Sequence, residues 1–89
     1  ELTFLNISNN NISDSGLELF SKCYFKKLKE LNLYNNDISD NGIKHLEKMR
    51  LNELTLINLS GNSITDNGIR YLSKNTQILK LETLIIFNN

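Results

Sequence analysis

The sequence lacks the features that mark several classes of protein. It contains one cysteine and one histidine in 89 residues, so the chain can form neither an internal disulfide nor a closed structural zinc site. An excess of charge of one sign is also lacking, because ten lysines and arginines offset ten aspartates and glutamates. The chain therefore has neither the basic excess of a nucleic-acid-binding protein nor the acidic excess of a solvating tail.

Long apolar stretches are absent as well. The longest apolar runs are a few residues, whereas a helix that spans a bilayer needs about 18. The sequence offers no paired carboxylates on one face, no nucleophile beside a base and no glycine-rich phosphate loop. We therefore expect no enzymatic activity, no cofactor, no metal site and no small-molecule substrate, and we expect neither a membrane nor a nucleic acid as a partner.

What the chain does have is leucine, isoleucine and asparagine in a regular order. Leu2, Leu28, Leu54 and Leu81 begin successive copies of the pattern L-x-x-L-x-L-x-x-N. In the first three copies, the segment I-[ST]-D-x-G-[IL]-x-x-[LF] follows. The sequence is therefore divided into units that start near residues 2, 28 and 54, with a partial unit from residue 81.

Each unit predicts one short strand and one short helix. In x-x-L-x-L the apolar residues alternate, so one face of a strand points into a core and the other points outward. Ser13, Ser39 and Thr65 each precede an aspartate and are predicted to lie at a helix N-terminus, with about two turns of helix after them. Lysines at positions 22, 48 and 74 are predicted to lie near the ends of these helices, where they suit the helix dipole.

These units resemble the leucine-rich repeat, and the resemblance covers the whole chain. The second half of the unit is most similar to the helical subclass found in ribonuclease inhibitors, GTPase-activating proteins for Ran and bacterial effectors. The resemblance implies an α/β solenoid, a curved right-handed βα superhelix with a four-stranded parallel sheet on its concave face and short helices on its convex face. Because no capping segment flanks the units, we expect residues 1–89 to be a fragment of a longer array.

Outward strand positions form three columns on the predicted concave face, and exposed aromatic residues are typical of interface cores. Tyr34 is the first candidate for partner contact, although Phe4 and Phe87 lie near the ends and have packing against further units as an alternative. Asn6, Asn32 and Asn58 share one column and are predicted to hydrogen-bond to one another, with recognition of a partner as the alternative. The complete set of predicted partner-binding residues is Tyr34, Phe4, Leu56, Phe87, Glu30, Asn32 and Asn58.

A second set of asparagines ends each strand motif. Their side-chain amides both donate and accept, so they can bond to backbone groups left unpaired where the chain turns away from the sheet. We predict a structural ladder made of Asn10, Asn36, Asn62 and Asn89.

The remaining candidates are interpreted as structural. His45 has no second ligand at metal spacing and is predicted to be a solvated surface residue, while Cys23 aligns with Met49 and is predicted to pack. Lys22, Lys26, Lys27 and Lys29 form a basic group that is predicted to be a solvated edge, with weak attraction to an acidic partner as the alternative.

The function favoured by these observations is a protein–protein interaction scaffold, with the resemblance to bacterial effectors implying a host protein as the partner. The alternative is a regulator of a small GTPase, although neither Arg50 nor Arg70 occupies a strand column. Three N-x-S sequons, at Asn6, Asn11 and Asn58, raise a third possibility, a secreted receptor ectodomain. Because disulfide-bonded caps are missing, we favour a location in the cytoplasm or, after export, inside a host cell.

Overall fold

Strands and helices alternate along the chain. The computed structural model describes residues 1–89 and contains four strands, three α-helices and one 3-10 helix. In chain order these are β1 (Phe4–Asn6), α1 (Ser13–Phe20), β2 (Glu30–Asn32), α2 (Asp40–His45), η1 (Leu46–Met49), β3 (Leu56–Asn58), α3 (Asp66–Lys74) and β4 (Thr83–Ile85). All four strands run parallel in the order β1-β2-β3-β4. The predicted α/β fold with a four-stranded parallel sheet and short helices is therefore confirmed.

Equivalent residues of successive units pair with one another in the sheet. Leu5 lies opposite Leu31, and Leu31 lies opposite Ile57. The same register continues past the strand ends, because the backbone N–H groups of Asn9 and Asn35 donate to the carbonyls of Tyr34 and Ser60 at 2.8 and 2.9 Å. Each residue of a unit is thus held beside its counterpart in the next unit, so sequence columns become rows of neighbouring side chains across the sheet.

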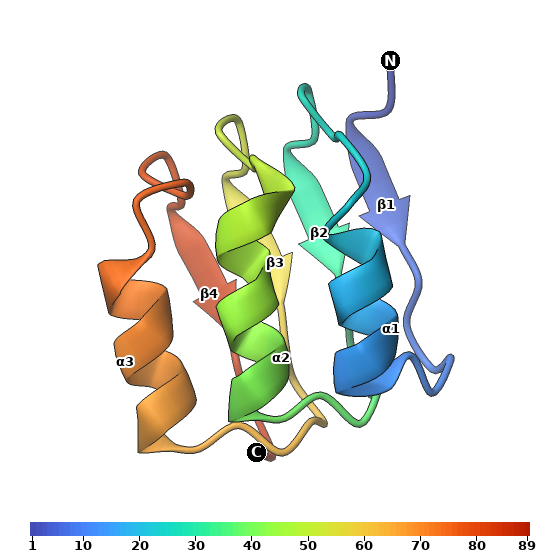
Figure 1. Ribbon diagram of the computed structural model, residues 1–89, viewed down its shortest axis with the longest axis vertical. Helices are drawn as coiled ribbons and strands as arrows, with labels where there is room; N and C mark the ends of the chain where they lie inside the picture. The colour runs from blue at the N-terminus through green and yellow to red at the C-terminus, as the bar shows by residue number, and fades with distance from the viewer.

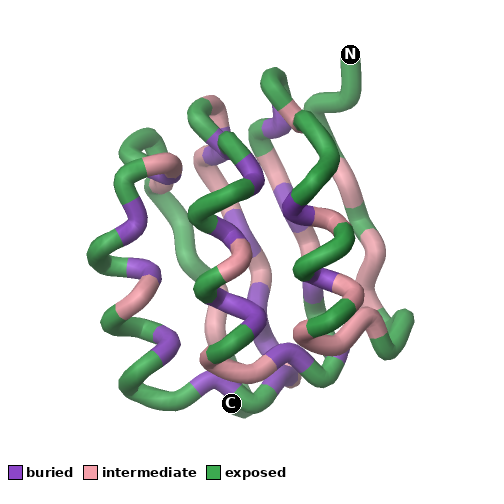
Figure 2. The backbone as a smooth tube through the Cα atoms, viewed as in Figure 1, coloured by how far each residue is buried: buried purple, intermediate pink, exposed green.

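The helices cover only one face of this sheet. In Figure 1, α1, α2 and α3 stand side by side in front of the strands, which lie in a layer behind them. The middle residue of β2, Leu31, is fully buried toward the helices, whereas Glu30 and Asn32 on either side of it remain half-buried. Figure 2 shows the same alternation along the inner strands. The other face of the sheet carries no helix, and we call it the outer sheet face.

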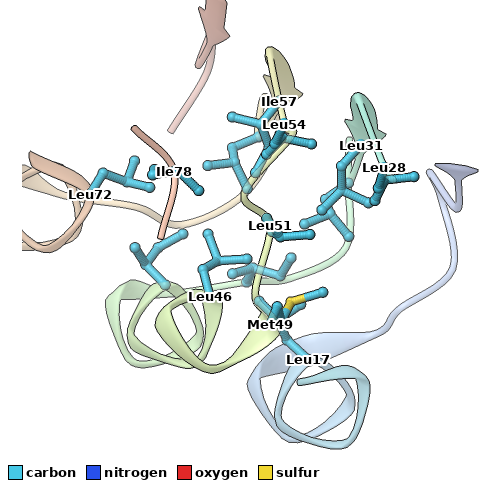
Figure 3. Close-up of a cluster of buried hydrophobic side chains, with 14 of the residues drawn as sticks. Leu17, Leu28, Leu31, Leu46, Met49, Leu51, Leu54, Ile57, Leu72 and Ile78 are labelled. Atoms are coloured by element: carbon cyan, nitrogen blue, oxygen red, sulfur yellow. The ribbon is translucent and has the colours of Figure 1, made fainter. Parts of the chain in front are cut away.

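One apolar core fills the space between the two layers. Leucine side chains from the sheet side face leucine and methionine side chains from the helix side (Figure 3). Each fully buried leucine or isoleucine contributes about 1.5–3 kcal/mol relative to an exposed one, so this core is the main source of stability. Its fully buried members are Leu17, Leu28, Leu31, Leu33, Ile38, Ile43, Leu46, Met49, Leu51, Leu54, Ile57 and Leu59.

All three helices begin at or directly after the predicted residue, but a side chain caps the N-terminus in only two of them. Ser39 and Thr65 are N-cap residues, and their hydroxyl oxygens accept hydrogen bonds from the N–H groups two residues further on, both at 3.3 Å. Ser13 is the first residue of α1, at the predicted N-terminus, but no side chain caps this helix: Ser13 has a φ of 63°, and its N–H donates to the Asn36 carbonyl. Lys22 lies two residues beyond the end of α1, whereas Lys48 lies in the last turn of η1 and Lys74 ends α3.

Candidate functional site

The outer sheet face is built from three rows of side chains. One row contains Phe4, Glu30, Leu56 and Thr83, and a second contains Asn6, Asn32, Asn58 and Ile85, as the strand register requires. The third row, which lies just past the strand ends, contains Ser8, Tyr34, Ser60 and Phe87 and is aligned by the continuing backbone hydrogen bonds. All seven residues that the sequence predicts as partner contacts therefore lie in these rows.

Tyr34 lies at an inner position of this face and is held in place from one side. Its ring edge lies 3.2 Å from the position that a side-chain carbon of Gly61 would occupy. Gly61 has a φ of 70°, so glycine suits both the backbone and the close approach of the ring. The Tyr34 side chain remains 41% exposed. Tyr34 is thus an aromatic residue whose ring lies against Gly61 and is partly exposed to solvent.

Phe4 and Phe87 expose more of their side chains, 54% and 71%, at the two outermost strands. Leu56 and Glu30 lie between them and are half-buried. Ser60 differs from its predicted outward position, because it is only 4% exposed and its hydroxyl accepts a hydrogen bond from the Phe87 N–H at 2.8 Å. Apolar contact area on this face therefore comes from its aromatic residues, Leu56 and Ile85.

The asparagines of the middle row do not bond to one another as predicted. Each side-chain oxygen instead accepts a hydrogen bond from the backbone N–H two residues later in its own unit. The distance is 3.0 Å in every case, for Ser8 to Asn6, Tyr34 to Asn32 and Ser60 to Asn58. Each asparagine of the row is therefore held by a hydrogen bond within its own unit. No side-chain hydrogen bonds link the asparagines of successive units.

Three of the four asparagines of the second set bond to the backbone of adjacent units, whereas the Asn10 side chain bonds only to the carbonyls of Ile7 and Ser8 in its own unit. The Asn62 side-chain oxygen accepts from the N–H groups of Asn36 and Ile38, both at 2.9 Å. Its amide nitrogen donates to three carbonyls, those of Leu33, Leu59 and Ser60. Asn36 repeats this arrangement one unit earlier and Asn89 repeats part of it one unit later. In Asn36 and Asn62, both the side-chain oxygen and the NH₂ group are therefore hydrogen-bonded to the backbone.

Hydrogen bonds between successive units join the helix N-termini, and the sequence pattern did not predict them. The Asp14 carboxylate accepts from the backbone N–H and the hydroxyl of Ser39, and Asp40 accepts from the same two groups of Thr65. The Thr65 hydroxyl and then its backbone amide lower the pKa of Asp40 from its ordinary value. The spacing of 25 residues was visible in the sequence, but each residue also had a local role at its own helix terminus.

The helix side carries scattered polar groups. His45 is only half-exposed, and its Nδ1 atom is buried without a hydrogen-bond partner, so the prediction of a solvated histidine is wrong. Cys23 is exposed and does not pack as predicted. The Lys44 ammonium lies 4.9 Å from the centre of the Tyr71 ring. No three histidine, cysteine, aspartate or glutamate side chains come together as the ligands of a metal ion would.

The predicted basic group is divided between two places. Lys27 and Lys29 lie beside Glu53, which also forms a 2.8 Å ion pair with Lys80. The hydrogen bond and charge of Lys80, followed by the charges of Lys27 and Lys29, lower the pKa of Glu53. Lys22 instead lies near Lys48 and Arg50. The four lysines therefore do not form a single basic patch.

The geometry defines a protein made of stacked strand–helix units, each of which adds one strand to a common sheet. Three segments of the chain, residues 2–21, 26–46 and 51–73, match the leucine-rich repeat family. The chain belongs to this family. No curated protein matches the chain. Leucine-rich repeats are commonly protein-interaction modules and generally act as binding scaffolds without enzymatic activity.

No helix of this chain has the length and apolar character that a membrane-spanning helix requires.

Proposed function

We propose that the chain binds a partner protein through the outer sheet face, with Tyr34 at the centre of the contact. The observation that carries this proposal is the Tyr34 ring, which is packed against Gly61 on one side and 41% exposed on the other. An aromatic side chain held in one position loses little conformational freedom on binding, and such residues are frequent among those that dominate binding energy.

The surroundings of Tyr34 support the same proposal. Phe87 adds apolar area in the same row, and Phe4 and Leu56 add it in the first row, while Glu30 and the asparagines provide polar groups among them. Repeat proteins bind through extended surfaces made by several units, and these residues come from all four strand segments. The contact would therefore extend across units and not be confined to one loop.

The partner-binding set consists of Tyr34, Phe4, Leu56, Phe87, Glu30, Asn32 and Asn58. The GTPase-regulator alternative receives no comparable support, because neither arginine belongs to the outer sheet face. Arg50 lies over the Tyr24 ring at 5.6 Å, and Arg70 on α3 donates to Asn67. The bacterial-effector role rests on the resemblance of the repeat units alone.

Selection of random displayed peptides against the chain tests the proposal. Peptides are enriched on the unmodified protein and their dissociation constants are measured with Tyr34→Ala and with Leu19→Ala. Leu19 is 65% exposed on the helix side and is the matched control. We expect Tyr34→Ala to weaken binding about 30-fold, the effect of losing a residue that contributes about 2 kcal/mol, and Leu19→Ala to leave it unchanged. Peptides that lose affinity with Leu19→Ala and not with Tyr34→Ala would refute the proposal.

A further inference from the structure

The middle row of the outer sheet face has an arrangement that bears on the chemistry of the partner. Asn6, Asn32 and Asn58 are direct neighbours on adjacent strands, which are about 4.8 Å apart. In each of them one side-chain atom accepts a hydrogen bond from a backbone N–H at 3.0 Å. A backbone N–H can only donate, so the accepting atom is the oxygen, and the NH₂ group occupies the other branch of the amide.

None of these three NH₂ groups has a hydrogen-bond partner within the protein. The oxygen of Asn6 accepts a second bond, from the Ser8 hydroxyl at 2.8 Å, which leaves the Asn6 NH₂ group free as well. The buried side-chain nitrogen and oxygen atoms without partners are His45 Nδ1 and Asn75 Nδ2. The NH₂ groups of the half-buried residues Asn32 and Asn58 lack a partner but are not among these buried atoms. They are therefore in contact with solvent.

The row therefore presents three oriented donors, while each of its side-chain oxygens already accepts at least one hydrogen bond from the fold. A ligand group that docks on these NH₂ groups has to supply lone pairs. Glu30 is the only charged residue in the three rows of this face, and its negative charge disfavours a partner carboxylate. Uncharged carbonyl oxygens satisfy both conditions.

We propose that this row binds an uncharged, extended segment of a partner protein by donating hydrogen bonds from the NH₂ groups of Asn6, Asn32 and Asn58 to its backbone carbonyl oxygens. The inference rests on the proposed function, because Tyr34 and Leu56 flank the row and provide the apolar contact. From the first to the third asparagine the row spans about 10 Å, which is two strand spacings and the length of about three extended residues. Carbonyls on one edge of an extended segment recur every second residue, about 6.6 Å apart, so two of them fit along it.

Replacement of asparagine by aspartate tests the donors without removing the fold's own hydrogen bond. Aspartate keeps an oxygen for the backbone N–H and presents an acceptor where the NH₂ group stood. The test variant carries Asn6→Asp, Asn32→Asp and Asn58→Asp. The control variant carries three equal changes at exposed asparagines outside the rows, Asn11→Asp, Asn41→Asp and Asn52→Asp. Both variants gain the same charge, so a difference between them reports on the position of the change.

The probes are uncharged peptides selected on the unmodified chain. We expect the test variant to lose at least 10-fold in affinity, since each hydrogen bond contributes about 2- to 13-fold, and the control variant to lose less than 3-fold. Equal affinities of the two variants would overturn the inference. If Tyr34→Ala still weakens binding in that case, the proposed function stands without the donor row. If Tyr34→Ala has no effect either, both proposals fail.

A change in the peptide gives a second readout that does not depend on any protein variant. Conversion of one peptide carbonyl to a thiocarbonyl weakens it as an acceptor and strengthens the adjoining N–H as a donor. We expect a thioamide at one or two positions of the peptide to lower its affinity for the unmodified chain. We expect the aspartate variant not to restore this affinity. Tighter binding of the thioamide peptides at those positions would mean that the protein uses the donors of the ligand, and the inference would be wrong.

Discussion

Removal of the Asn62 side chain is expected to be among the most destabilising single changes outside the apolar core. The side chain is buried and makes five hydrogen bonds, three of which join the third unit to the second. In Asn62→Ala the N–H groups of Asn36 and Ile38 lose their common acceptor. Ile38 is fully buried, and so is Asn36, so water has little access to these two donors in the folded chain.

The size of the effect follows from these two donors. A buried group left without its partner costs about 1–3 kcal/mol, so two of them cost about 2–6 kcal/mol in the free energy of unfolding. The carbonyls that lose a bond add less, because carbonyl groups tolerate the loss of one partner more easily. Asn10 provides a matched control, since its side chain only donates to the carbonyls of Ile7 and Ser8 in an exposed turn. We expect Asn10→Ala to cost about 1 kcal/mol.

Urea unfolding followed by far-ultraviolet circular dichroism measures both variants against the unmodified chain. A change in midpoint at constant slope reports stability, and a protecting osmolyte extends the measurement to a variant that is unfolded in water. If Asn62→Ala lost no more stability than Asn10→Ala, the two orphaned donors would not cost what buried donors cost, and the structural interpretation of the ladder would be refuted.

Three further predictions concern other parts of the structure. Leu31→Ala removes a fully buried side chain from the core, so urea titration should show a loss of about 2–5 kcal/mol; a loss under 1 kcal/mol would contradict the packing. Gly68→Ala should also destabilise, by about 1–3 kcal/mol, because the added carbon meets the Asp40 carboxylate and Ile64; a gain of about 1 kcal/mol, usual for this change inside a helix, would refute the close approach. Asp40, whose pKa is lowered by Thr65, stabilises the fold above its ordinary pKa of 3.8, and this contribution is lost as the pH falls below that value. Asp40→Asn should therefore reduce the loss of stability on acidification, measured by urea titrations between pH 2 and 6, whereas unchanged acid sensitivity would show that the Asp40–Thr65 bond contributes nothing.

The sheet could be predicted because its determinants are local and repeated. A spacing of 26 or 27 residues places Leu5, Leu31, Ile57 and Leu84 in the same position of successive units, and parallel pairing of those units leaves a single register. Alternation within each strand then decides which side chains face the helices. The outer positions of Tyr34 and Asn32 follow from the same pattern.

The details that the sequence did not predict depend on contacts between units. Ser60 has the outward position of its row, but it is covered and its hydroxyl bonds to the Phe87 N–H. Ser39 and Thr65 become helix caps where an aspartate of the previous unit holds their N–H and hydroxyl groups. Ser13 does not form this pair of bonds, and it has a left-handed backbone conformation with a φ of 63°.

Asparagine illustrates how one residue type takes two roles a few positions apart. In Asn36 and Asn62 the fold uses both the oxygen and the NH₂ group, so nothing remains for a ligand. In Asn32 and Asn58 the fold uses only the oxygen, and this single bond also fixes the direction of the free NH₂ group. The repeat therefore yields a buried row that binds successive units together and an outer row of donors that a partner can use. The spacing of the units aligns both rows, and the number of hydrogen bonds that the backbone makes to each amide decides which row is available for recognition.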